Sequence, residues 1–98
     1  MNAIIIKARV KPEHRHELLQ MFKDTSQTDQ LPAACLERRL YEEAIAPMNL
    51  LLVEEWSDMA AMHGYMASER FRALIGAVKV LGDLVDIRTS ESTVIEGG

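Results

Sequence analysis

The spacing of apolar side chains changes from one segment of the chain to the next. The order of these segments limits the possible folds more than any single residue does. Four segments have the apolar patterns of strands, three of them alternating and one apolar on both faces, and two segments repeat with the period of a helix. Strands are expected at residues 3–10, 35–45, 50–56 and 84–94, and helical segments at residues 12–27 and 58–81. This order, β-α-β-β-α-β, predicts a ferredoxin-like α+β fold with one antiparallel four-stranded sheet and helices on one face.

The second helical segment is expected to form two consecutive helices. One face of its first part carries four residues: Met59, Met62, His63 and Met66. This phase fails after residue 68, and a new N-cap at Ser68 explains the change. Ser57 is the expected N-cap of the first of the two helices, and Gly82 is expected to end the second.

Length and charge restrict the number of domains and the kinds of partner. A chain of 98 residues has room for one core, so residues 1–98 predict a single domain with a flexible tail at 96–98. A net charge of −4, with no basic run longer than Arg38-Arg39, argues against nucleic acid and anionic membranes. No apolar run approaches the roughly 20 residues that span a bilayer. The single cysteine, Cys35, favours a cytoplasmic location.

The strand at residues 50–56 is apolar on both faces through Leu50–Val53. Helices on one side of the sheet leave the other face of this strand, with Ile5 beside it, open to water. A second copy packed sheet against sheet is the simplest cover, so we expect a homodimer. Five charged residues are expected to surround the contact: Lys7, Arg9, Glu37, Arg39 and Asp86. The alternative is a monomer whose Lys and Arg side chains cover this face.

A set of spaced residues lies between positions 49 and 71: Asn49, Glu54, Trp56, Ser57, Asp58, Ala60, Ala61, His63, Ser68 and Phe71. This set resembles the core signature of antibiotic biosynthesis monooxygenase (ABM) domains, as do Pro12-Glu13 and Ala34-Cys35-Leu36. The resemblance covers about residues 4–90 and implies a dimeric α/β barrel with a small pocket between sheet and helices. It also implies one of several activities, because members of this family include cofactor-free monooxygenases of quinols and polyketide phenols, haem-degrading enzymes and a sugar isomerase.

His63 is the candidate catalytic residue. Its position among the methionines predicts that the imidazole faces the sheet, where it can take the proton of a bound phenol near neutral pH. The phenolate then reacts with O2 without a cofactor, which gives a cofactor-independent monooxygenase acting on a quinol or similar phenolic molecule. His63 can instead be a structural residue bonded to the backbone or to Glu54. The alternative for the whole chain is a non-catalytic module for small-molecule binding or dimerisation.

Four residues are expected to shape the substrate pocket: Phe22, Asn49, Trp56 and Phe71. Trp56 can stack on an aromatic ring of the substrate, or it can simply be a core residue. Its strand is apolar on both faces, so the pattern does not show on which face Trp56 lies. Asn49 can bond a substrate hydroxyl or serve a turn, and the two phenylalanines can equally be core residues. Glu54 and Glu55 must point to opposite faces, and a carboxylate here is expected to pair with Lys7 or Arg9.

The sequence predicts neither a cofactor nor a metal ion. His14 and His16 are two residues apart, about 200° around a helix, and so cannot hold one ion together. The chain has no glycine-rich phosphate loop for a flavin or nucleotide, and Cys35 has no histidine near it in sequence to activate it. Haem degradation fits poorly, because family members with that activity carry an Asn on the first strand where this chain has Ile4-Ile5-Ile6.

Overall fold

A computed structural model of the chain describes residues 2–26 and 31–90, and the elements follow the expected order. The last residue of the first predicted helix, the end of the last strand (91–94) and the tail (96–98) lie outside the described residues. The elements are β1 (Asn2–Val10), a 3-10 turn η1 (Pro12–His14), α1 (Arg15–Ser26), β2 (Cys35–Glu42), β3 (Asn49–Trp56), α2 (Met59–Met66), α3 (Glu69–Leu81) and β4 (Gly82–Ser90).

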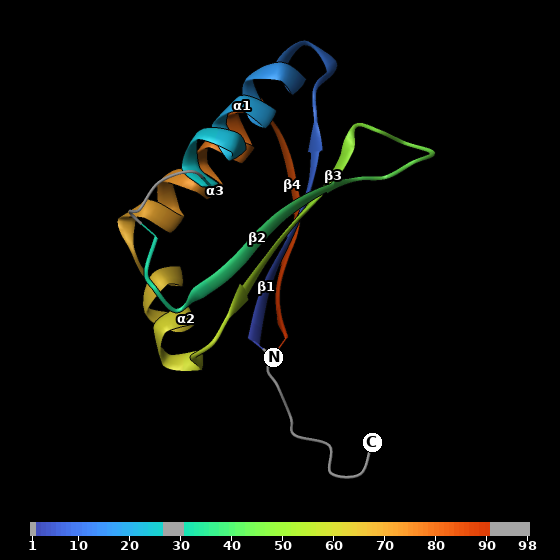
Figure 1. The fold of residues 1–98 in the computed structure, drawn as a ribbon. Helices are drawn as coiled ribbons and strands as arrows, with labels where there is room; N and C mark the ends of the chain where they lie inside the picture. The colour runs from blue at the N-terminus through green and yellow to red at the C-terminus, as the bar shows by residue number, and fades with distance from the viewer. Residues whose placement is uncertain (1, 27–30, 91–98) are drawn as a thin grey trace, which may run out of the picture.

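The four strands form one antiparallel sheet in the order β2-β3-β1-β4, which confirms the ferredoxin-like fold. Figure 1 shows the helices on one side of this sheet and the tip of the β2–β3 hairpin extending away from them. The two strands with the longest apolar runs, β1 and β3, lie in the centre, and the more highly charged strands lie at the edges. In the described part of the chain, no helix is long and apolar enough to cross a membrane.

Direct pairing of β1 with β3 assigns side chains to the two faces of the sheet. Ile6 lies opposite Leu52 and Ile4 opposite Glu54, and all four residues are buried beneath the helices. The intervening residues, such as Ile5 opposite Val53, lie on the other face, which we call the open face.

The core lies between the helices and the opposite face of the sheet. α1 contributes Leu18 and Phe22, α2 contributes Met62 and Tyr65, and α3 contributes three residues. The three from α3 are Phe71, Leu74 and Val78.

The break between the two later helices is confirmed, and one of their two predicted caps is wrong. Ser68 begins α3, and its Oγ accepts a hydrogen bond from the Phe71 N–H at 3.2 Å. α2 begins one residue later than predicted, because Asp58 rather than Ser57 is its N-cap. The Asp58 carboxylate accepts a hydrogen bond from the Ala61 N–H at 3.0 Å.

Gly82, where α3 passes directly into β4, has no room for a side chain. A Cβ on this residue would lie 2.2 Å from the Arg9 carbonyl oxygen and 2.9 Å from the Val10 Cα. We expect Gly82→Ala to lower the free energy of unfolding by about 1–3 kcal/mol, because the backbone of β1 must shift. Gly76→Ala, in α3 with nothing within 4 Å of the new Cβ, is the control. In urea unfolding, Gly76→Ala should raise the free energy of unfolding by about 0.5–1 kcal/mol. Equal changes in the two variants would contradict this account.

Candidate functional site

A charged pair lies beneath the helices in an otherwise apolar layer. Glu54 of β3 is completely buried, and Arg38 lies directly opposite it on β2. The Arg38 Nε is 2.7 Å from the Glu54 Oε2, and the Arg38 side chain is only 5% exposed. The expectation that a carboxylate here pairs with Lys7 or Arg9 is therefore wrong for Glu54. Its partner comes from the other neighbouring strand.

The surroundings of Glu54 change the pKa of its carboxyl in opposing directions. Burial raises the pKa of the Glu54 carboxyl above its ordinary value, while Arg38 and the indole N–H of Trp56 act in the opposite direction without reversing the shift. Among the described residues, neither the Glu54 oxygens nor the Trp56 Nε1 have a hydrogen bond of normal geometry, although Arg38 and Trp56 both lie close to the carboxylate. A buried acceptor and a buried donor are thus left side by side.

Aromatic side chains continue from this pair into the core. The Trp56 ring lies 5.0 Å from the Tyr65 ring, and the Phe71 ring meets Tyr65 edge-on at 5.4 Å. Burial and the charge of Glu54 raise the pKa of Tyr65 to about 12, so its phenol stays neutral. Burial likewise raises the pKa of the Cys35 thiol, which makes this cysteine a poor nucleophile.

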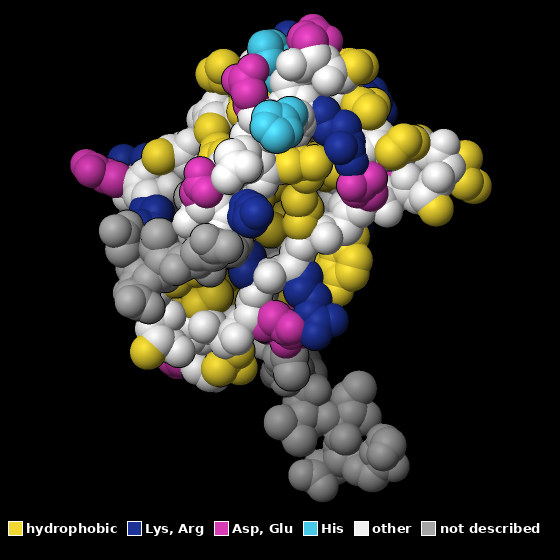
Figure 2. Space-filling model, turned by 45° about the horizontal axis from the view of Figure 1, so that its top comes forward, with side chains coloured by type: hydrophobic (Ala, Val, Ile, Leu, Met, Phe, Trp, Pro, Cys, Tyr) yellow, Lys and Arg dark blue, Asp and Glu magenta, His cyan; other side chains and the backbone are white. Residues whose placement is uncertain are grey.

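Two hollows border Arg38. One, of about 190 Å³, lies between α1 and the sheet and is lined by Leu19, Phe22, Lys23, Arg38, Leu40 and Leu52. Figure 2 shows hydrophobic side chains in the depression on this side of the molecule, with Lys and Arg side chains next to them. The other, of about 260 Å³, is lined mainly by the segment that enters β2, from Leu31 to Arg38. Both are smaller than the ~300–1,000 Å³ of typical drug-sized sites, so each suits a small molecule.

The structure brings three of the predicted site residues to the helix side of the sheet. Trp56 is 1% exposed beside the Arg38–Glu54 pair, which answers the question of its face. Phe22 lines the hollow below α1, whereas Phe71 packs on Tyr65 deeper in the aromatic cluster.

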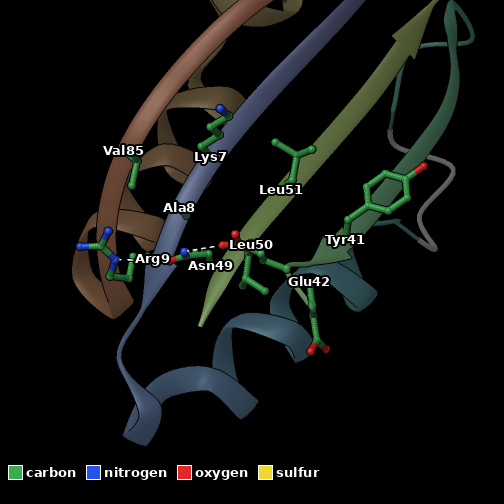
Figure 3. Close-up of a pocket in the computed structure, with 10 residues that line it drawn as sticks. Lys7, Ala8, Arg9, Tyr41, Glu42, Asn49, Leu50, Leu51 and Val85 are labelled. Atoms are coloured by element: carbon green, nitrogen blue, oxygen red, sulfur yellow. Dashed lines mark hydrogen bonds between the residues drawn. The ribbon is translucent and has the colours of Figure 1, made fainter. Parts of the chain in front are cut away.

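Asn49 lies apart from these residues, on the open face. Its Oδ1 accepts a hydrogen bond from the Arg9 Nε at 3.3 Å, and its Nδ2 donates to the Glu43 Oε2 at 2.6 Å. Figure 3 shows it in a different hollow, of about 380 Å³, where Lys7 and Leu51 also point away from the helices. The sheet therefore separates Asn49 from Trp56.

His63 does not face the sheet, so the prediction of its orientation is wrong. The side chain is exposed, and α2 buries Met62 and Tyr65 instead. Each residue turns a helix by 100°, so the face centred on Met62 directs the next residue sideways to solvent. α2 has only eight residues and apolar side chains on several sides, which is why the spacing did not identify its buried face.

Arg38 is the residue that sequence reasoning missed, although a signal for it was present. Strands joined by a hairpin pair at equal distances from its centre. Ala46 lies in the predicted turn, and positions 38 and 54 are both eight residues from it. Counting outward from Ala46 would have placed the arginine opposite the glutamate, as observed.

We expect Arg38→Met to destabilise the fold in a pH-dependent way. At about pH 8 the variant should lose about 3–5 kcal/mol, because Glu54 is left as a buried carboxylate without its cation. The loss should shrink toward pH 5. Removing Arg38 raises the folded pKa of Glu54 further above its ordinary 4.5, so the native state takes up a proton that the unfolded state lacks.

In the wild type and in Arg38→Met alike, the contribution of Glu54 to stability falls as the pH rises from its pKa in the unfolded chain to its pKa in the folded protein. This fall is larger in the variant, because its folded pKa is higher. Urea unfolding at the two pH values measures the difference. Arg39→Met, on the same strand with an exposed side chain, is the matched control and should cost under about 1 kcal/mol at either pH. If Arg38→Met loses the same free energy of unfolding at both pH values, this account is contradicted.

Comparisons with known proteins agree with the fold and place the chain in a family. Residues 1–77 match the family model described as antibiotic biosynthesis monooxygenase. No curated protein matches the chain. Within residues 2–26 and 31–90, no three His, Cys, Asp or Glu side chains gather as a metal site would require.

Several solved structures share the fold. A conserved protein from Methanosarcina mazei superposes with a TM-score of 0.80 at 22% identity, over 94% of this chain and 92% of that one. A Deinococcus radiodurans protein named for the same family gives 0.75 at 24% identity, over 99% and 100%. A Bacteroides thetaiotaomicron protein of unknown function, described as a possible oxidoreductase, gives 0.78 at 13% identity, over 93% and 96%. Since the family model spans most of the sequence, this chain belongs to the antibiotic biosynthesis monooxygenase family.

Proposed function

We propose that this protein is a cofactor-independent monooxygenase that acts on a quinol or a similar phenolic molecule. The observation that carries the proposal is the small apolar hollow below α1, whose wall includes Arg38 of the buried charged pair, in a chain of the ABM family. Aliphatic residues and Phe22 suit the ring, and a polar group at the wall suits its hydroxyl. A lone thiol with no intrachain partner fits the reducing cytoplasm, where we place the protein.

The substrate itself can supply the electrons for this reaction. A quinol and O2 give a hydroxyquinone and water, so one oxygen atom enters the ring and the other leaves as water. All four electrons come from the quinol, two as it becomes a quinone and two as the new hydroxyl forms. The protein has to bind the ring, accept a proton from its hydroxyl and keep bulk water from the reactive anion.

His63 as the proton acceptor stays a prediction, which its exposed position on α2 weakens. Asn49 as a substrate ligand also stays a prediction, and it applies to the hollow on the open face and not to the hollow below α1. Trp56, Phe22 and Phe71 as substrate-binding residues also stay predictions: all three are buried on the helix side, and Phe22 is the one of the three that lines the hollow below α1.

We expect the wild-type protein to consume O2 when supplied with menadiol, and to yield a product one oxygen atom heavier than menadione. An oxygen electrode and mass spectrometry with ¹⁸O2 measure the two results. His63→Ala separates the candidate bases: a loss of about 100-fold or more with an unchanged melting temperature supports His63. No uptake above the uncatalysed rate by the wild type would overturn the proposed activity and favour a non-catalytic module.

The open face supports a second part of the proposal, a homodimer formed sheet to sheet. Ile5, Leu51 and Val53 are half-buried at its centre, and Tyr41 and Val85 are 45% and 56% exposed near them. The charged residues predicted to surround the contact lie on this face as well, Arg39 beside Glu37 and Asp86 beside Arg88. Covering such an apolar patch stabilises association by about 25 cal/mol per Å² before ordering costs.

Val53→Glu is expected to convert the dimer to a monomer, because it places a charge at the centre of the contact. Analytical ultracentrifugation at micromolar concentration gives the mass. Val80→Glu, the same change at a 72%-exposed position of α3, should leave the dimer intact. A wild-type mass of one chain would overturn the dimer and leave the activity to be judged by oxygen uptake.

A further inference from the structure

We infer that Glu54 and Trp56 form the site for the substrate's hydroxyl group, and that Glu54, rather than His63, accepts its proton. The binding part of this inference stands on the structure alone. The proton-transfer part rests on the proposed function.

The Glu54 carboxylate and the Trp56 indole match a hydroxyl group in hydrogen-bonding character. The Glu54 Oε1 and the Trp56 Nε1–H are both buried and lie near each other, yet within the described structure neither has a hydrogen bond of normal geometry. A phenolic hydroxyl donates one hydrogen bond and accepts another, so it satisfies both atoms at once. Buried polar atoms without well-formed hydrogen bonds destabilise a fold, and a hydroxyl placed between this donor and this acceptor would bond well to both.

The chemistry of the pair suits proton transfer. The phenol O–H bond breaks, the proton moves to the Glu54 Oε1, and the phenolate replaces the carboxylate as the counter-ion of Arg38. The net charge of the site is unchanged by this step, so the buried region never holds a charge without a partner. Arg38 from β2 and Trp56 from β3 lower the pKa of Glu54 against the effect of its burial. The charge of Glu54 in turn raises the pKa of the Cys35 thiol from β2 and of the Tyr65 phenol from α2.

Arg38 controls access to this site. It forms part of the wall of both hollows, whereas Glu54 lines neither. Because Arg38 borders both hollows and its Nε contacts the Glu54 carboxylate, its side chain is the group that a ring would have to displace to reach Glu54. Rotation about the several single bonds of the arginine side chain opens the way, with Phe22 and Leu52 beside the ring and the hydroxyl toward Glu54.

Binding of 1-naphthol and naphthalene, two probes that differ only in the hydroxyl, tests the site without turnover. Equilibrium dialysis of the wild type should give naphthol a Kd about tenfold or more below that of naphthalene. Trp56→Phe keeps a ring but removes the donor, and should reduce this preference at least threefold with naphthalene binding unchanged. Equal affinities for the two probes in the wild type, or an undiminished preference in Trp56→Phe, would overturn the hydroxyl site.

Glu54→Gln tests proton transfer, because the amide can still accept a hydrogen bond but cannot take up the proton. Its kcat/KM for menadiol-dependent O2 uptake should fall about 100-fold or more, while its naphthol Kd rises less than tenfold. The matched control is Glu55→Gln, the neighbouring residue on the open face, which should keep the wild-type rate. Circular dichroism and urea unfolding verify that each variant is folded.

The outcomes separate this inference from the proposed function. If Glu54→Gln keeps kcat/KM within threefold of the wild type, or only His63→Ala loses it, Glu54 is not the proton acceptor and the monooxygenase proposal stands. If the wild type consumes no O2 with menadiol, the proton step fails with the proposed function. The naphthol preference and its loss in Trp56→Phe then decide the hydroxyl site by themselves. If Glu54→Gln does not fold, the Trp56→Phe binding result decides the site in the same way.

Discussion

Direct pairing between the two central strands is the constraint on which the rest of this structure depends. Residues 2–9 of β1 each lie opposite one residue of β3, so the pair sorts its side chains into two sets with opposite surroundings. One set lies under the helices with the buried carboxylate of Glu54, and the other forms the open face. Neighbouring residues such as Glu54 and Glu55 thereby belong to different chemical environments.

The cost of the buried pair is itself informative. Two charges taken out of water regain little net stability even when they are in contact, and an apolar replacement of similar volume is often as stable. A core built for stability alone would not need Glu54 or Arg38. Together with the poorly formed hydrogen bonds around it, this favours a functional reason for keeping the pair, at a position where small hollows border Arg38.

Much of the fold was predictable from the sequence, because most elements have a recognisable apolar pattern and the order of elements has one well-known arrangement. Details that depend on contacts across the sheet or on the phase of a short helix were not predictable in that way. Periodicity within β3 cannot identify a partner on β2, so Arg38 was missed. α2 is apolar on several sides, so His63 was assigned to the wrong face.

The alternation in β3 also has an evolutionary consequence. Removing or inserting one residue within β3 would exchange its two faces, moving Glu54 to the open face and a neighbour into the core. The loop after β2, residues 43–48, carries the 95%-exposed Ile45 and has no such restriction. Related chains should therefore differ in length at this loop and keep β3 at constant length, so that loop changes alter the outer surface while the inner chemistry is inherited intact.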